Sequence, residues 1–261
     1  MTKKYALACP TSMGVRITPE DRMAVHNSRF YLQATSAETN VLNVASSLDR
    51  ECLALTKFVE GSPIAAFIKA QLRARNIRFE GGEVPQGGPW GYRHQFNIAD
   101  SGFGLRAPRV WNDRAGEVGR TLSASDFDIE RIFGQEGIEI LHISALIAAM
   151  SEDTTKCCLE LAKAAKKYGT LVSFDLNYRA TFWKGREDEL SKVKVFMNNI
   201  KHVDSISLHD IYNWCNRQHV QYTTTFNYDS KMTWTEMIKS YIFYFRQKLR
   251  YVNNSDRMIE T

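Results

Sequence analysis

The ten residues TLVSFDLNYR at positions 170–179 decide the fold class of this chain. The first six are mostly apolar or β-prone, which is typical of a strand buried in a parallel sheet. Gly169 stands before them and ends a helix that begins at Ser151. A similar apolar run, residues 138–143, precedes that helix. Strand, helix and strand at this spacing predict a right-handed βαβ unit and a mostly parallel sheet.

The same alternation fills the chain on the N-terminal side of this unit, so the predicted fold class is α/β. Residues 5–10 and 52–56 predict two further buried strands. Ser36 and Ser62 predict the N-caps of two helices, because a serine hydroxyl can accept hydrogen bonds from the first free amides of a helix. For the first of these helices we expect the buried face to carry Val41, Val44, Ala45 and Leu48.

The composition changes twice along the chain. Nine glycines and three prolines fall within residues 81–119. Such breakers predict extended strands and loops that cover a site, rather than core helices. After Gly185 neither glycine nor proline occurs again. In that tail we expect a helix at about 187–200, a short strand near 205–208 and a helix at about 235–251.

Charge, cysteines and hydropathy exclude several classes of protein. The net charge is +5, but basic and acidic residues are interspersed, so no basic stripe predicts nucleic-acid binding. The five cysteines show no zinc or disulfide spacing, which favours free thiols in a reducing compartment. No apolar run reaches the roughly 20 residues that span a bilayer. We therefore expect a cytoplasmic protein with no membrane or nucleic-acid partner.

Three polar side chains follow the predicted strand of residues 170–175 at its carboxyl end. Parallel sheets bind ligands at that edge, and alternate residues share a face while the chain stays extended. Asp175, Asn177 and Arg179 would then converge on one volume. A carboxylate, an amide and a planar guanidinium suit a polyol that bears a carboxylate or a phosphate. The alternative is an ordinary strand-end turn in which Asp and Asn act as caps.

The Asp-x-Asn-x-Arg motif at residues 175–179 resembles the second half of the sugar site in the ribokinase/phosphofructokinase-B superfamily. Further segments follow in that family's order over about residues 5–200. They are SAETNV at 36–41, the glycine turn FVEGSPI at 58–64, VWNDRAG at 110–116, and LSASDFD at 122–128 ahead of ILHIS at 140–144. The stretch DLNYRATFW at 175–183 is most similar to the 2-keto-3-deoxygluconate kinases.

The resemblance implies a ribokinase-like three-layer sandwich with a small β lid from about residues 12–33 and 88–112. It also implies ATP-dependent phosphorylation of 2-keto-3-deoxygluconate or a related sugar acid, with ATP and Mg as cofactors and room for a homodimer through the lid. By the resemblance, the substrate-binding residues are Thr35, Ser36, Asn40, Asn112, Arg114 and Arg179. The residues that would face the nucleotide phosphates are Asp175, Asn177 and Arg179.

The chain also departs from the family pattern. Thr35 and Ser36 stand where the family has paired glycines, so the backbone can approach a sugar less closely. The sequence contains no Gly-x-Gly-Asp segment, which in the family supplies the anion hole and the catalytic base. Residues 207–212 do not match the family's metal-linked Asn-x-x-Glu motif. We therefore identify no catalytic residue, expect impaired kinase activity, and find little support for ATP and Mg binding by this chain.

These features divide the chain into two parts. Residues 1–200 form the ribokinase-like sugar-binding part, and residues 201–261 form a divergent helical tail without ATP-site motifs. The abrupt composition change leads us to suspect a truncated or frame-disrupted gene and a sheet that is incomplete on its C-terminal side. Two functions stay open at this point: a carbohydrate kinase by descent with impaired chemistry, and a non-catalytic sugar-acid binding or regulatory protein.

Overall fold

The main body is a parallel sheet of six strands, found in a computed structural model that describes residues 3–20, 27–102, 104–175, 177 and 205–206. The strand order is β12-β11-β10-β1-β4-β6, and every neighbouring pair is parallel. The strands are β1 (Tyr5–Pro10), β4 (Cys52–Leu55), β6 (Ile77–Glu80), β10 (Ile138–Ser144), β11 (Leu171–Asp175) and β12 (Ser205–Ile206). The predicted parallel sheet is therefore confirmed.

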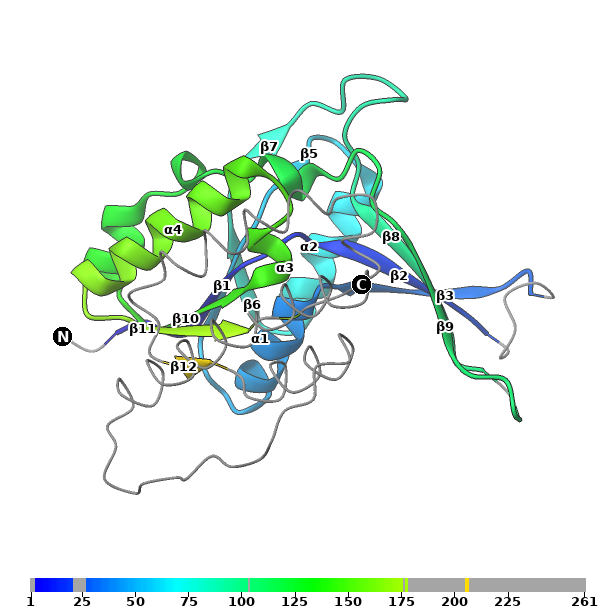
Figure 1. The fold of residues 1–261 in the computed structure, drawn as a ribbon, viewed down its shortest axis with the longest axis horizontal. Helices are drawn as coiled ribbons and strands as arrows, with labels where there is room; N and C mark the ends of the chain where they lie inside the picture. Colours follow the sequence, from blue (N-terminus) through cyan, green and yellow to red (C-terminus); the bar gives the residue numbers. More distant parts are fainter. Residues whose placement is uncertain (1–2, 21–26, 103, 176, 178–204, 207–261) are drawn as a thin grey trace, which may run out of the picture.

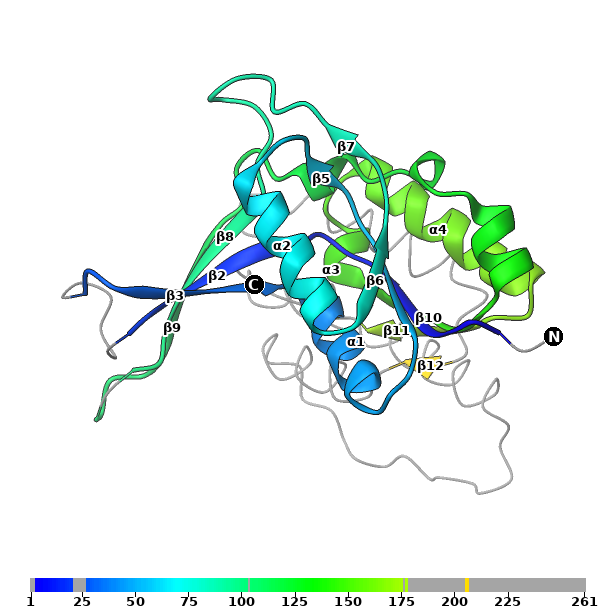
Figure 2. The ribbon, with the colours of Figure 1, turned by 180° about the vertical axis from the view of Figure 1, so that it is seen from behind.

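Helices cover both faces of this sheet, which gives three layers (Figures 1 and 2). On one face lie α1 (Ala37–Ser47) and α2 (Pro63–Ala74). On the other lie α3 (Ala145–Ala148) and α4 (Glu152–Lys167). Short turns complete the α4 side: the 3-10 turns η2 (Val118–Thr121) and η3 (Ala124–Asp126), and the π-helical turn η4 (Glu130–Glu136).

The sheet separates two hydrophobic cores, because successive side chains of a strand point to opposite faces. On β4, Cys52 and Ala54 pack on the α1 and α2 side, whereas Leu53 and Leu55 pack on the α4 side. All four side chains are fully buried. A strand covered on both faces has no polar face, which explains why these segments are continuous apolar runs in the sequence.

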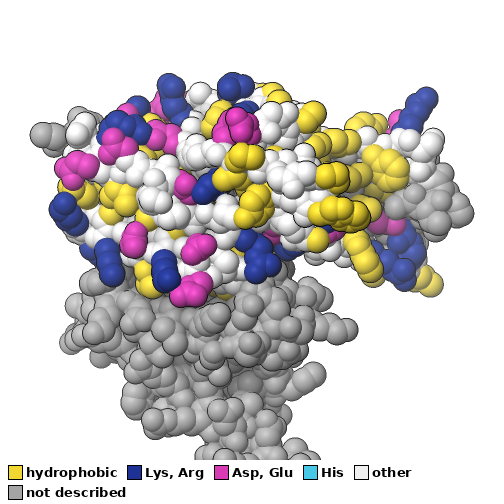
Figure 3. Space-filling model, turned by 90° about the horizontal axis from the view of Figure 1, so that it is seen from above, with side chains coloured by type: hydrophobic (Ala, Val, Ile, Leu, Met, Phe, Trp, Pro, Cys, Tyr) yellow, Lys and Arg dark blue, Asp and Glu magenta, His cyan; other side chains and the backbone are white. Residues whose placement is uncertain are grey.

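A second sheet of four strands projects from the main body (Figure 1). It has the order β3-β2-β8-β9, with β2 (Gly14–Pro19), β3 (Phe30–Thr35), β8 (Gln95–Asp100) and β9 (Arg109–Asp113). We call this sheet the lid. In Figure 3, hydrophobic side chains gather on the visible face of the projecting part. A third, two-stranded sheet pairs β5 (Phe58–Val59) with β7 (Glu83–Val84).

Most of the expected elements are confirmed. Ser36, Ser62 and Ser151 are the N-caps of α1, α2 and α4, and each side chain accepts a hydrogen bond from an amide of the first turn. The described residues between 81 and 117 form strands and loops as expected, and η2 begins at Val118. The helices expected at about 187–200 and 235–251, and any incompleteness of the sheet, fall outside the described residues. Within the described part, no helix is both long and apolar enough to cross a bilayer.

The buried face of α1 differs from the prediction. Val41, Val44 and Leu48 are 36%, 63% and 69% exposed, whereas Glu38 and Thr39 are buried. The helix begins at the carboxyl edge of the sheet, where Thr11 approaches it from the end of β1. The polar side chains of the first turn therefore face inward, where they pair with other polar groups. The helix is rotated accordingly, and part of its apolar stripe is exposed.

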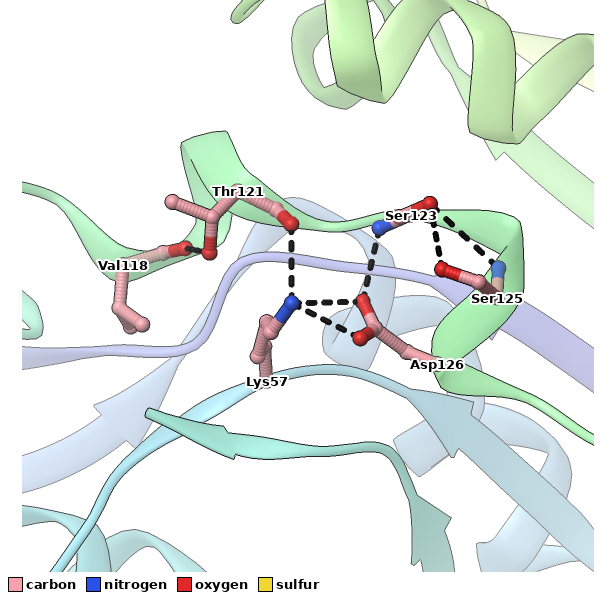
Figure 4. A network of polar contacts seen from close by, with 6 residues as sticks. All are labelled: Lys57, Val118, Thr121, Ser123, Ser125 and Asp126. Atoms are coloured by element: carbon pink, nitrogen blue, oxygen red, sulfur yellow. Dashed lines mark hydrogen bonds and ion pairs between the residues drawn. The ribbon is translucent and has the colours of Figure 1, made fainter. Parts of the chain in front are cut away.

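A buried ion pair attaches the segment with η2 and η3 to the end of β4 (Figure 4). Lys57 Nζ lies 2.8 and 2.9 Å from the two carboxylate oxygens of Asp126 and donates to the carbonyl of Thr121 at 3.0 Å. The carboxylate also accepts from the amide of Ser123 at 2.8 Å. Only 11% and 13% of the Lys57 and Asp126 side chains are exposed. Little water can reach these groups, so each charge is stabilised mainly by the other.

We expect Asp126→Asn to destabilise the protein by about 3 kcal/mol, because Lys57 would stay buried without a counter-charge. The free energy of unfolding in urea measures this. The double variant Lys57→Met/Asp126→Leu should recover most of the loss, since an apolar pair of similar volume removes the buried charge. As a control, Glu152→Gln removes the exposed pair with Lys156. An equally large loss there would contradict the argument.

Candidate functional site

Polar side chains gather where three neighbouring strands of the main sheet end. Thr11 and Ser12 follow β1, Ser144 ends β10, and Asp175 ends β11. These strands are adjacent and parallel, so their carboxyl ends meet at one edge of the sheet. Parallel α/β sheets bind ligands at this edge. The first turn of α1 completes the group, because its N-cap Ser36 contacts Thr11.

Thr11 joins β1 to the beginning of α1. Its hydroxyl lies 2.7 Å from Ser36 Oγ and 2.8 Å from Glu38 Oε2. Ser36 Oγ accepts from the amide of Thr39 at 2.9 Å, and the Thr39 hydroxyl in turn accepts from the amide of Ser36. This reciprocal cap fixes the first turn of α1 and holds Glu38 against the strand end.

Glu38 is a buried carboxyl group, with only 3% of the residue exposed. Burial raises its pKa above the ordinary value, while its own backbone amide, the Thr11 and Ser144 hydroxyls and the charge of Arg114 act in the opposite direction. Oε2 contacts Thr11, but Oε1 has no hydrogen-bond partner among the described residues. Glu38 therefore joins the ends of β1 and β10 electrostatically, with one acceptor atom unsatisfied.

Asn177 closes the group on the β11 side. Its Nδ2 donates to Ser144 Oγ at 3.2 Å, and its amide donates to Asp175 Oδ1 at 2.8 Å. Its φ of 34° is positive, so the chain turns there and does not stay extended. The expected alternation therefore does not hold between Asp175 and Asn177. Asp175 caps a strand-end turn instead, as in the alternative that the sequence left open. Arg179 lies outside the described residues.

Arg114 and Glu117 form the other flank of the site. Arg114 Nη1 lies 2.9 and 3.0 Å from the two Glu117 oxygens. Ser12 Oγ donates to Glu117 Oε1 at 2.6 Å. Burial raises the pKa of Glu117, and the charge of Arg114 and the Ser12 hydroxyl oppose this rise. Arg114 is the direct partner of Glu117, and its charge is the smallest of the influences that oppose the raised pKa of Glu38.

The structure separates the predicted site residues into two groups. The predicted substrate residue Ser36 takes part in the contacts at the strand ends, as do Asp175 and Asn177, which were expected to face the nucleotide phosphates. Arg114 lies on their flank, paired with Glu117. The others are less enclosed: Thr35 is half-buried at the end of β3, Asn40 is exposed on α1, and Asn112 is exposed on β9 opposite Asn97.

Sequence reasoning missed Thr11, Ser12, Ser144 and Glu117. It placed Glu38 in a turn that meets the sugar but did not predict its burial. A signal was available for three of them: Thr11 and Ser12 follow a predicted buried strand, and Ser144 ends another. The rule that directed attention to Asp175 applies equally to those strand ends. Glu38 follows a predicted N-cap, where a carboxylate is ordinarily an exposed first-turn acid. Glu117 lies in a glycine-rich segment with no periodicity to predict its burial.

Two features of the described residues bear on ATP and Mg. None of them form a group of three or more His, Cys, Asp or Glu that could hold a metal ion. At the starts of α1, α2 and α4, the side chains of Ser36, Ser62 and Ser151 each occupy one of the amides that could bind a phosphate. We therefore derive no chemical step through either cofactor from this part of the chain.

The fold is shared with carbohydrate kinases. A Thermotoga maritima 2-dehydro-3-deoxygluconokinase matches at a TM-score of 0.67 and 23% identity, over 77% of this chain and 59% of that protein. A Listeria grayi PfkB family carbohydrate kinase matches at a TM-score of 0.69 and 23% identity, over 85% of this chain and 65% of that protein. A Pyrococcus horikoshii sugar kinase in complex with ATP matches at a TM-score of 0.63 and 16% identity, over 82% of this chain and 67% of that protein.

These matches confirm the ribokinase-like fold with its lid, which the sequence resemblance implied. No protein-family model matches the chain. The identities are below 25%, so the likeness concerns the fold, and this chain spans only about 59% of the Thermotoga protein and 65% of the Listeria protein. The activity and substrates of those complete proteins therefore enter only as proposals for this chain.

We expect Glu38→Gln to stabilise the protein near neutral pH, because it removes a buried charge. The sign follows from the raised pKa of Glu38. Below the ordinary value of 4.5 this group does not destabilise the wild-type protein, and the wild-type protein loses stability as the pH rises toward the folded pKa. Urea unfolding at about pH 7 and about pH 4.5 should therefore show a gain at the higher pH that shrinks at the lower one. Glu139→Gln, at an exposed pair with Arg50, is the control. A variant that loses stability equally at both pH values would contradict the expectation.

Proposed function

We propose that this chain descends from PfkB-type carbohydrate kinases and that its described part forms the sugar-acid site. The expected substrate is 2-keto-3-deoxygluconate or a related sugar acid, and the activity of the lineage is ATP-dependent phosphorylation of a hydroxyl. The observation that carries the proposal is the convergence of Thr11, Ser36, Ser144 and Asn177 at one sheet edge, in a fold shared with a 2-dehydro-3-deoxygluconokinase.

The chemistry of the site supports a polyol that bears a negative charge. Hydroxyl groups can both donate and accept, so Thr11, Ser36 and Ser144 match the hydroxyls of a sugar. The amide of Asn177 offers both a donor and an acceptor. Arg114 is connected to the end of β1 through Glu117 and Ser12, and a guanidinium matches the geometry of a carboxylate.

The proposal includes sugar binding without phosphoryl transfer by this chain alone. Positioning and electrostatic stabilisation supply almost all of the catalysis in phosphoryl transfer. The printed sequence has no Gly-x-Gly-Asp segment to provide the anion hole and base. Loss of a single donor of such a hole costs about 3 to 4 kcal/mol, so loss of the whole segment removes measurable turnover. The second candidate function is therefore a non-catalytic sugar-acid binding or regulatory protein, and the absence of glycine from residues 186–261 favours it.

We further propose a cytoplasmic location and a boundary between a sugar-binding part and a divergent tail at about residue 200. The cysteine spacing supports a reducing compartment, since it matches no disulfide framework. The end of glycine and proline usage at Gly185 supports the boundary.

Calorimetry should detect binding of 2-keto-3-deoxygluconate, and a coupled assay with ATP and Mg should detect no product. We expect Ser144→Ala to weaken the binding by about tenfold, because it removes the hydroxyl that joins Asn177 to the site. Ser47→Ala, an exposed hydroxyl at the far end of α1, is the matched control. Ordinary turnover of ATP would overturn the non-catalytic part, and absence of binding would overturn the sugar-acid site.

We also propose that two copies of the chain pair through their lids. In the lid register, Ile17 stands opposite Leu32 and Ile98, and Ile98 stands opposite Trp111. These four side chains form one row across the sheet, and Leu32, Ile98 and Trp111 are 46%, 38% and 75% exposed. A row of this kind on a flat sheet can pack against its own copy about a twofold axis.

Ile98→Asp should shift the protein from dimer to monomer, because it places a charge at the centre of this row. Sedimentation at several protein concentrations measures the shift. Val110→Asp introduces the same charge one strand away, on the opposite face of the lid. That control should remain dimeric, and a wild-type protein that is monomeric at all concentrations would refute the pairing.

A further inference from the structure

Glu117 lies where two strands of the lid join the main body. Strand β2 begins at Gly14, two residues after Ser12, and β9 ends at Asp113, next to Arg114. Glu117 contacts both of these junctions: its carboxylate accepts from Ser12 Oγ at 2.6 Å and pairs with Arg114 Nη1 at 2.9 and 3.0 Å. The Glu117 side chain is fully buried, whereas 26% of the Arg114 side chain is exposed.

Backbone hydrogen bonds and a glycine hold the segment around Glu117 against the main body. Arg93 donates its amide to the carbonyl of Gly116 at 2.8 Å and accepts from the amide of Val118 at 2.9 Å, so both flanks of Glu117 are bonded to a neighbouring segment. Gly119 lies against Ser12, and a Cβ at that position would stand only 2.0 Å from Ser12 Oγ. The segment can therefore approach Ser12 this closely only with a glycine at position 119.

This arrangement restrains Arg114. Its Nη1 contacts both oxygens of the fully buried Glu117 carboxylate, so that end of the guanidinium is held beside Ser12 at the end of β1. The charge of Arg114 also has a small influence on Glu38, which contacts Thr11 at the same strand end. An arginine that is already oriented loses less conformational entropy when it binds a ligand.

We propose that Glu117 is the positioning residue of the sugar-acid site. It holds Arg114 in the orientation that receives the substrate's carboxylate, and its bond with Ser12 attaches this pair to the end of β1. This inference rests on the proposed sugar-acid function. Glu117 would act without touching the sugar. The preference for acid over neutral sugars would then depend on the linked residues Ser12, Glu117 and Arg114.

The first test compares binding of 2-keto-3-deoxygluconate with binding of its uncharged amide by calorimetry. In Glu117→Gln, which keeps the shape but removes the charge, affinity for the acid should fall by about tenfold while affinity for the amide stays within about twofold. An equal loss for both ligands would mean a purely structural role and would overturn the inference. Glu152→Gln, which removes a carboxylate from an exposed pair on α4, should change neither affinity.

A double-mutant cycle then asks whether Glu117 acts through Arg114. Arg114→Ala should lose the preference for the acid, and Glu117→Gln should cause no further loss in that background. Additive losses would overturn the inference, because they would mean that the two residues act independently. Ser12→Ala should show a smaller loss of the same preference, since it removes only one of the contacts that fix Glu117.

A measurement without ligand separates this inference from the proposed function. The Arg114 Nε–Hε signal in the NMR spectrum, assigned by its loss in Arg114→Lys, should be sharp and shifted from the exposed arginines in the wild type. It should move toward them in Glu117→Gln. An unchanged signal would refute the positioning role even if the sugar acid binds. Absence of binding by the wild type, with the signal behaving as expected, would instead refute the sugar-acid function.

Discussion

Parallel strands end at the same edge of a sheet, and this constraint determines where the chain concentrates its polar groups. β1, β10 and β11 bring Thr11, Ser144 and Asp175 to that edge together. A buried polar group that lacks a partner costs free energy, so each group must find a partner among its neighbours. Thr11 finds Ser36 and Glu38, and Ser144 finds Asn177. The contacts of the site are therefore also the contacts that satisfy the strand ends.

The same constraint explains the orientation of α1. A helix on a parallel sheet ordinarily buries its apolar stripe, and Leu42 does lie in the core. At its first turn, however, the helix meets the Thr11 hydroxyl at the end of β1, and Glu38 points inward to accept from it, while the buried Thr39 pairs with the N-cap Ser36. Val44 and Leu48 are left exposed as a result. The orientation of α1 is thus a compromise between burial of apolar area along its length and satisfaction of polar groups at its first turn.

This compromise shows what could be predicted from the sequence. The strands, the helix caps and the parallel sheet follow from local signals, such as apolar runs and serines before helices, and the structure has them. The buried acids could not be predicted in this way, because burial of Glu38 and Glu117 depends on hydroxyls and an arginine that are distant in the sequence. Asn177 shows a related limit. Its place in the site comes from a positive φ, which breaks the alternation that first drew attention to it. The segment that would carry Arg179 lies outside the described residues, so the second half of that motif stays a prediction.

The balance of charge in the site restricts the ligands that it can take. Glu38, Glu117 and Asp175 supply three acidic groups, and Arg114 is the cation that acts on two of them. If all three acids were ionised, a further carboxylate would meet net negative charge. Burial raises the pKa of both Glu38 and Glu117, so ionisation of either acid is disfavoured, and Glu117 has Arg114 as a direct partner. A second cation near Asp175 would strengthen the attraction that Arg114 exerts on a sugar acid, and the sequence motif offers Arg179 for that role. A site without Arg179 would then keep a weaker preference for the acid over a neutral polyol.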